Sequence, residues 1–264
     1  MHFFTLKNSA ILSVTAALYL TAWTHTAQAS NVVKTVTNGA LTFELEFEDE
    51  LYLEGGRALM WNEALQQPYI DAANQWLTAL VGVEGKPLHT IRMRISVAEM
   101  NDGNGYAGPD SEEQVGEYEI PTSGTLVIGN HTYEQGFDQV EFKANILHEM
   151  GHILGIGSYT ESFTEYSEEL QGNVLKVPHS MAAQKYNQIY GNSYQYVPIS
   201  DDGGHLYDYV LQEDKKRVLA NGEVLAPLTQ EFMANGVVFG AVTLGVLDDI
   251  GYQVSYSGAE GYKP

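Results

Sequence analysis

Two histidines four residues apart, in a segment with helical periodicity, limit strongly how this chain can fold. Residues 148–152 read His-Glu-Met-Gly-His, and the apolar pattern around them predicts a helix over about residues 139–154 that stops at Gly155 and Gly157. On a helix, positions i and i+4 lie one turn apart on the same face, so both imidazoles can reach one ion. The chain must turn sharply after this helix for a third ligand to approach the ion from below.

The same five residues are typical of a zinc site that hydrolyses amide bonds. Zinc binds neutral imidazole nitrogen, and a catalytic ion takes three protein ligands and a water. We therefore predict His148 and His152 as zinc ligands and Glu149 as the catalytic base. The ion lowers the pKa of its water toward about 7, Glu149 takes the proton, and the hydroxide attacks a carbonyl carbon. The same carboxylic acid then protonates the leaving nitrogen.

A resemblance to a known family supplies the third ligand. Residues 148–155, His-Glu-Met-Gly-His-Ile-Leu-Gly, resemble the metzincin consensus, in which Gly155 supports the turn after the second histidine. Compact metzincins have a third histidine three residues after this glycine, where this chain has Ser158. The leishmanolysin-like branch has it after a long insertion, and residues 201–205, Asp-Asp-Gly-Gly-His, resemble that branch. The resemblance implies His205 as the third zinc ligand, with His179 as its rival.

The resemblance to this branch extends from about residue 41 to residue 252, and it implies that the chain is a bacterial secreted member. Residues 222–227 and 241–252 resemble its Met-turn and final helix. Leu225 stands where the Met-turn methionine is expected, so the resemblance implies Leu225 as the apolar floor beneath the metal. Met233, later in the chain, serves this role only if the loop is arranged differently. The resemblance also implies that residues 124–128 form the edge strand above the cleft, to which an extended peptide substrate adds.

Periodicity along the chain predicts an α+β fold. A loop is predicted over residues 101–116, where glycines and acidic residues dominate, and its carboxylates make calcium a possible second cation. Strands are predicted over residues 41–47, 91–97 and 125–128, and helices over residues 62–81, 139–154, 180–190 and 241–250. With the resemblance, this implies a metzincin-like fold. It has an N-terminal twisted mixed sheet with two long helices, and a mostly irregular C-terminal lobe that ends in a helix.

The first 29 residues have the pattern of a signal peptide. Lys7 is the only Lys, Arg, Asp or Glu among them, an apolar run covers residues 10–23, and Ala-Gln-Ala follows at 27–29. We predict cleavage after residue 29 and export from a bacterium to the periplasm or the medium, without stable membrane insertion. An N-terminal membrane anchor is the alternative. Residues 30–264 then form one catalytic domain, with an upper lobe over about 30–155 and a lower lobe over about 156–264.

Composition excludes several kinds of site and partner. The formal net charge of −21 repels nucleic acid and anionic lipid. The chain has no cysteine, which excludes a cysteine nucleophile and a cysteine-ligated zinc ion. The zinc motif and the resemblance imply a peptide or protein substrate as partner, and no particular oligomeric state is predicted.

Two other functions fit part of the pattern. A gluzincin-like peptidase would use a downstream glutamate as third ligand, with Glu161, Glu165, Glu168 and Glu169 available. That hypothesis leaves Gly155 and the helix over 241–250 without a role. A non-catalytic secreted binding or adhesion domain would keep zinc for structure alone. The function we predict is a secreted zinc metalloendopeptidase that uses one catalytic zinc ion.

Overall fold

A computed structural model of the protein describes residues 31–48, 51–53, 57–100, 104–133, 138–160, 163–177, 180–210, 214–234 and 236–260. These residues form a five-stranded mixed sheet, four α-helices and several small two-stranded sheets, which confirms the predicted α+β class. Within this part of the chain, no helix combines the length and apolar character needed to cross a membrane. The predicted signal peptide lies outside the described residues.

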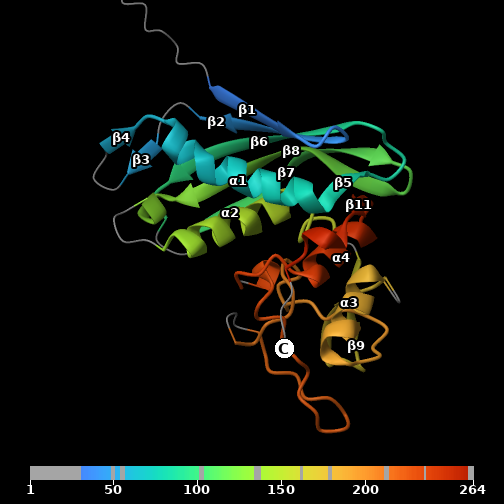
Figure 1. The fold of residues 1–264 in the computed structure, drawn as a ribbon. Helices are drawn as coiled ribbons and strands as arrows, with labels where there is room; N and C mark the ends of the chain where they lie inside the picture. The colour runs from blue at the N-terminus through green and yellow to red at the C-terminus, as the bar shows by residue number, and fades with distance from the viewer. Residues whose placement is uncertain are drawn as a thin grey trace, which may run out of the picture.

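The main sheet has the strand order β1-β2-β6-β8-β7. The three inner strands run parallel to one another, and each outer strand is antiparallel to its neighbour. Alternate side chains of β2 and β6 are buried, as their sequence pattern predicts. The strands are β1 (Val32–Thr37), β2 (Leu41–Phe47), β6 (His89–Ala98), β7 (Gly105–Val115) and β8 (Tyr118–Gly129), and they form the upper layer in Figure 1.

Two predictions for this sheet are wrong. The loop expected over residues 101–116 contains the strand β7, and the expected edge strand, residues 124–128, belongs to the inner strand β8. Most side chains of β7 are at least partly exposed, because an outer strand pairs on one side only. Burial therefore imposes no apolar alternation on β7, and its glycines and acidic residues are tolerated there.

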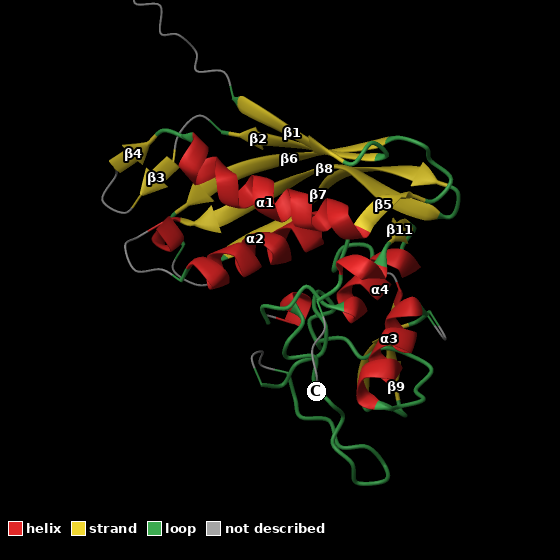
Figure 2. Ribbon diagram, in the orientation of Figure 1, coloured by secondary structure: helices red, strands yellow, loops and turns green. Residues whose placement is uncertain are grey.

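Helices α1 (Glu63–Ala79) and α2 (Gln139–Ile153) cover one face of the sheet (Figure 2). The Asn62 side chain caps α1 by accepting the Leu65 N–H, and Asp138 caps α2 in the same way. Both helices agree with the periodicity of the sequence. Helix α2 ends where two glycines with positive φ follow, at Gly155 and Gly157.

Below this layer, the C-terminal part of the chain consists mainly of loops and short elements (Figure 1). Ser180 and Gly240 precede its two α-helices, which agree with the predicted ones. The helices are α3 (Met181–Tyr190) and α4 (Ala241–Asp249), and the 3-10 helices are η1 (Asn130–Tyr133), η3 (Phe232–Ala234) and η4 (Tyr256–Gly258). The paired short strands are β3 (Leu51–Leu53) with β4 (Arg57–Leu59), β5 (Leu80–Val83) with β11 (Tyr252–Val254), and β9 (Thr164–Ser167) with β10 (Gly172–Leu175).

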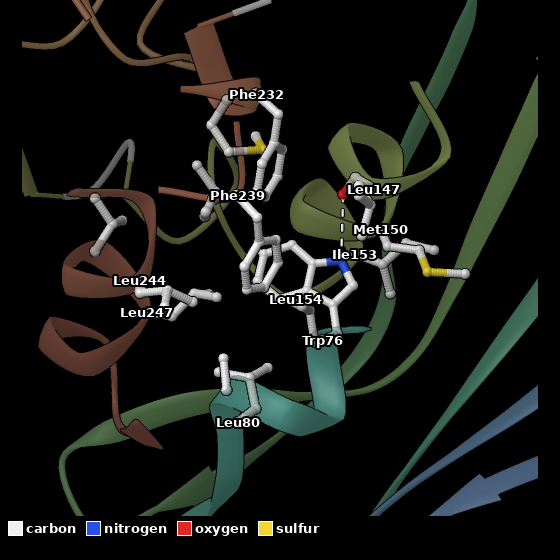
Figure 3. Close-up of a cluster of buried hydrophobic side chains, with 14 of the residues drawn as sticks. Trp76, Leu80, Leu147, Met150, Ile153, Leu154, Phe232, Phe239, Leu244 and Leu247 are labelled. Atoms are coloured by element: carbon white, nitrogen blue, oxygen red, sulfur yellow. Dashed lines mark hydrogen bonds between the residues drawn. The ribbon is translucent and has the colours of Figure 1, made fainter. Parts of the chain in front are cut away.

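Trp76 connects the two layers and reaches the backbone beside the histidine pair. Its side chain is fully buried, and its ring makes edge contacts with Phe232 and Phe239 from the C-terminal part, with centroids 5.3 and 4.9 Å away. The indole Nε1–H donates to the Leu147 carbonyl at 3.3 Å (Figure 3). The core therefore fixes α2, at the residue before His148, relative to the segment that contains Phe232.

Candidate metal centre

Three histidine side chains from two separate segments converge at the C-terminal half of α2. Their ligand atoms lie within 4.8 Å of one another. His148 and His152 project from consecutive turns of α2, and their Nε2 atoms are 3.0 Å apart. His205, from the loop that follows α3, has its Nε2 atom 3.2 Å from that of His148. The structure thus brings together the three histidines that the sequence singled out.

Hydrogen bonds at the opposite ring nitrogens determine which atoms face the centre. Each Nδ1 donates to an oxygen that only accepts: for His148 the Phe232 carbonyl at 2.6 Å, and for His152 the Ile156 carbonyl at 2.8 Å. His205 Nδ1 donates to the Asp202 carboxylate at 2.7 Å. In a neutral imidazole with a protonated Nδ1, Nε2 carries a lone pair.

Three Nε2 lone pairs that face one another are complementary to a cation. Two ligands of a tetrahedral zinc ion, each about 2.1 Å from the metal, lie about 3.4 Å apart. The observed Nε2 separations of 3.0 and 3.2 Å are close to this value. Rings whose Nδ1–H donates to a carbonyl or carboxylate are the usual arrangement of zinc-bound histidine. The donor set therefore fits zinc.

The electrostatic environment keeps the buried rings neutral. Burial, followed by the neighbouring imidazoles, lowers the pKa of His148 to about 3 and that of His152 to about 4. Burial acts against ionisation of Asp202, but hydrogen bonds from His205 and Gly204 hold the pKa of its carboxyl well below the usual range. At neutral pH, the two rings on α2 are in the form that binds metal, and Asp202 is an ionised acceptor for the third.

Glu149, between the two histidines of α2, has a buried and incompletely paired carboxyl group. Its Oε2 atom has no hydrogen-bond partner in the described part of the chain. Burial raises the pKa of Glu149 to about 8, and a divalent cation nearby would lower it again. A Cβ atom at Gly105, on β7, would lie 2.9 Å from the Glu149 Oε1 atom, so the outer strand passes directly over this carboxylate.

A cavity of about 920 Å³ opens beside the three rings and the Glu149 side chain. Its lining includes residues 104–107, from β7 and the turn before it, and also Thr229, Gln230, Phe232 and residues 236–238. Its lining includes the acidic residues Glu141 and Glu149 and no lysine or arginine among the described residues. The cavity therefore lies between an outer strand and the histidine cluster and has the size of a ligand site.

Two glycines after α2 allow the chain to turn beneath the cluster. Gly155 has φ of +113°, and a Cβ atom there would overlap the Tyr159 ring. Gly157 has φ of +98°, and its Cβ position is 3.4 Å from both His152 Nδ1 and the Gly204 carbonyl oxygen. The turn therefore packs against the loop that carries the third histidine.

Met233 makes an apolar contact beneath the helix. A Cβ atom at Gly151 would lie 2.5 Å from the Met233 sulfur, and the Met233 side chain is fully buried. Leu225 is also buried, but its backbone N–H donates to the Arg217 carbonyl in a separate loop. The loop is thus arranged in the way that brings Met233 to the histidine helix, and Leu225 as the apolar floor beneath the metal stays a prediction.

The other candidate ligands that the structure describes do not join the cluster. The donor group contains no carboxylate, so the described glutamates of the gluzincin-like hypothesis, Glu165, Glu168 and Glu169, are not part of it. His179 and Glu161 lie outside the described residues. Across the described ranges, no second group of three potential metal ligands occurs, so calcium is not supported there.

Three contributions to the site were missed from the sequence. The role of Asp202 as acceptor for His205 could have been predicted from the sequence. An acidic residue three positions before a histidine on a glycine-rich turn can reach the imidazole ring. The bond of the Phe232 carbonyl to His148 and the close approach of Gly105 to Glu149 leave no pattern in the sequence, because both depend on tertiary packing.

Comparison with known proteins agrees with this geometry. The family model described as leishmanolysin matches residues 110–263, more than half of the chain. The matched region contains the three histidines, Glu149, Met233 and α4. No match was found among curated proteins.

Proposed function

The chain belongs to the leishmanolysin family, and from this premise we propose that it is a secreted zinc metalloendopeptidase. The observation that carries the proposal is the convergence of three imidazole Nε2 atoms, from His148, His152 and His205, beside the Glu149 carboxylate. We propose the three histidines as the ligands of one zinc ion and Glu149 as the general base and acid.

The roles of the side chains follow from their surroundings. When bound, zinc supplies a Lewis acid that polarises a carbonyl group and acidifies water. Glu149 accepts the proton of the attacking water and returns it to the leaving nitrogen, and its unpartnered Oε2 atom suits this exchange. Asp202 and the Phe232 carbonyl hold two of the rings by their Nδ1–H groups. Met233 provides the apolar contact beneath α2.

The outer strand β7 supports binding of an extended peptide. Its first residues line the cavity, and among the described strands it pairs with β8 alone, so its other edge can accept a substrate strand. Pairing by backbone groups requires no chain terminus. A carboxypeptidase would also need a cation for the terminal carboxylate, and no lysine or arginine lines the described cavity. These features favour internal cleavage of peptide or protein chains.

On the basis of the sequence, we propose that the chain is exported and that its mature domain has two lobes. Residues 1–29 would be removed as a signal peptide, with export from a bacterium to the periplasm or the medium. The mature domain would consist of an upper lobe over about residues 30–155, which carries the sheet and α2, and a lower lobe over about 156–264, which supplies His205 and Met233.

Purified residues 30–264, assayed for zinc and for casein cleavage, test the proposed function. We expect about one zinc ion per chain, internal casein fragments by mass spectrometry, and loss of cleavage with 1,10-phenanthroline that added zinc restores. Stoichiometric zinc without hydrolysis of casein or of a diverse peptide library would instead support the non-catalytic binding domain. Fragments that arise only by trimming from one end would refute internal cleavage.

A further inference from the structure

Glu231 is a fully buried carboxylate that binds the N-terminus of the last helix. Its Oε1 atom accepts the Val242 N–H at 3.0 Å. Its Oε2 atom accepts the Thr243 N–H at 3.2 Å and the Thr243 hydroxyl at 2.7 Å. Three donors and the positive end of the α4 dipole offset the cost of burying this charge.

The cap that Glu231 provides replaces a local one. The N-cap residue of α4 is Gly240, which has no side chain to accept a hydrogen bond. A Cβ atom at Gly240 would overlap the Glu231 carboxylate, so only glycine leaves room for it. The helix therefore takes its cap from a residue that precedes η3 and not from its own flanking residue.

The two residues directly after Glu231, Phe232 and Met233, contact the helix and the loop that carry the three histidines. The Phe232 carbonyl accepts the Nδ1–H of His148. The Met233 carbonyl accepts the Leu206 N–H at 2.9 Å, next to His205, and the Met233 side chain packs at Gly151. A displacement of η3 would therefore move the acceptor of one ligand and the backbone anchor beside another.

We propose that Glu231 is a positioning residue for the metal centre. By joining the first turn of α4 to η3, its carboxylate fixes the Phe232 carbonyl that orients His148 and the Met233 backbone that anchors the His205 loop. This inference rests on the proposed function only in that the three rings hold a metal ion. It assigns Glu231 no contact with substrate or with the ion.

The variant Glu231→Gln tests this role, with Asp249→Asn as its matched control. Gln has nearly the same volume as Glu, but its amide NH₂ directs hydrogens at the α4 donors. Asp249 is also a helix-capping carboxylate of the C-terminal part: it accepts the N–H groups of Met181 and Ala182 at 2.7 and 3.1 Å, at the start of α3. Both donors belong to α3 and neither belongs to η3.

Two measurements separate positioning from stability. For each variant we would determine the zinc dissociation constant by competition with a chromophoric chelator, and the visible absorption spectrum with cobalt in place of zinc. We expect E231Q to weaken zinc binding about 10- to 100-fold, which is the usual effect of losing a residue that orients a metal ligand. We also expect it to shift the cobalt bands. D249N should lower the melting temperature and leave both the cobalt spectrum and the zinc affinity unchanged.

Wild-type zinc affinity and cobalt bands in E231Q, or equal changes in both variants, would overturn the proposal. If E231Q does not fold, Thr243→Val removes only the hydroxyl donor and decides the question by the same measurements: shifted cobalt bands support the role, and unchanged bands overturn it. Neither measurement requires hydrolysis. A wild-type chain that binds metal but cleaves nothing would therefore refute the peptidase function without affecting this test.

Discussion

Replacing Glu149 with alanine is expected to reduce kcat/KM for peptide hydrolysis by about 10²- to 10⁴-fold, the usual contribution of a general base, while zinc content stays at the wild-type level. The side chain lines the cavity with an oxygen that has no partner among the described residues, and it lies next to the proposed ligand His148, but it is not one of the three converging donors. Its removal should therefore eliminate proton transfer and leave the metal in place. Cleavage of a fluorogenic peptide and metal analysis of the same sample measure the two effects.

Glu141→Ala is the matched control for this substitution. Glu141 is also an acid of α2 that lines the cavity, but it is exposed and two helical turns before His148. Its loss should change kcat only slightly. If E149A kept more than about a tenth of the wild-type activity, or lost its zinc, the assignment of Glu149 as the base would be wrong.

Replacing His205 with alanine is expected to lower zinc affinity by more than about 100-fold and to remove activity. Loss of a hydrogen-bond partner of a ligand typically costs about 10- to 100-fold, and loss of the ligand itself should cost more. Two imidazoles from one helix leave the ion short of the three protein ligands of a catalytic site. Asp202→Asn should give an intermediate effect of about 10- to 100-fold, because its side chain only orients the ring. Equilibrium dialysis against buffered zinc distinguishes these levels.

The rival histidine provides the control for the ligand assignment. His179→Ala should retain wild-type zinc affinity and activity. If H179A lost zinc while H205A kept it, His179 would be the ligand and the observed cluster would not be the metal site. If neither variant lost zinc, a glutamate ligand, as in the gluzincin-like hypothesis, would regain support.

Elements with a strong local pattern were predictable from the sequence. Helix α1 and the strands β2 and β6 bury one face each, and the first half of α2 alternates buried and exposed residues, so their apolar periods are visible in the chain. The pairing of His148 with His152 is equally local, because one helical turn brings them together. His205 is different: its approach depends on the packing of Gly157 against Gly204, and only the family resemblance pointed to it.

The features that local pattern does not reveal share one physical cause. The path of an irregular segment is set by long-range contacts that leave little trace in local pattern. The bond from the Leu206 N–H to the Met233 carbonyl and the bond from the Val242 N–H to the Glu231 carboxylate hold the segment that brings Met233 to the helix. In the same way, strand β7 exists because β8 pairs with it, although its glycines and acids locally favour a loop.

X-ray absorption at the zinc edge tests the three-histidine centre most directly. For the purified chain with one zinc ion bound, we predict three imidazole ligands at about 2.0–2.1 Å and one further light-atom ligand. His205→Ala, loaded at high zinc concentration, should show two imidazoles. A spectrum of the wild-type chain with two imidazoles or fewer, or one that His205→Ala leaves unchanged, would contradict the account.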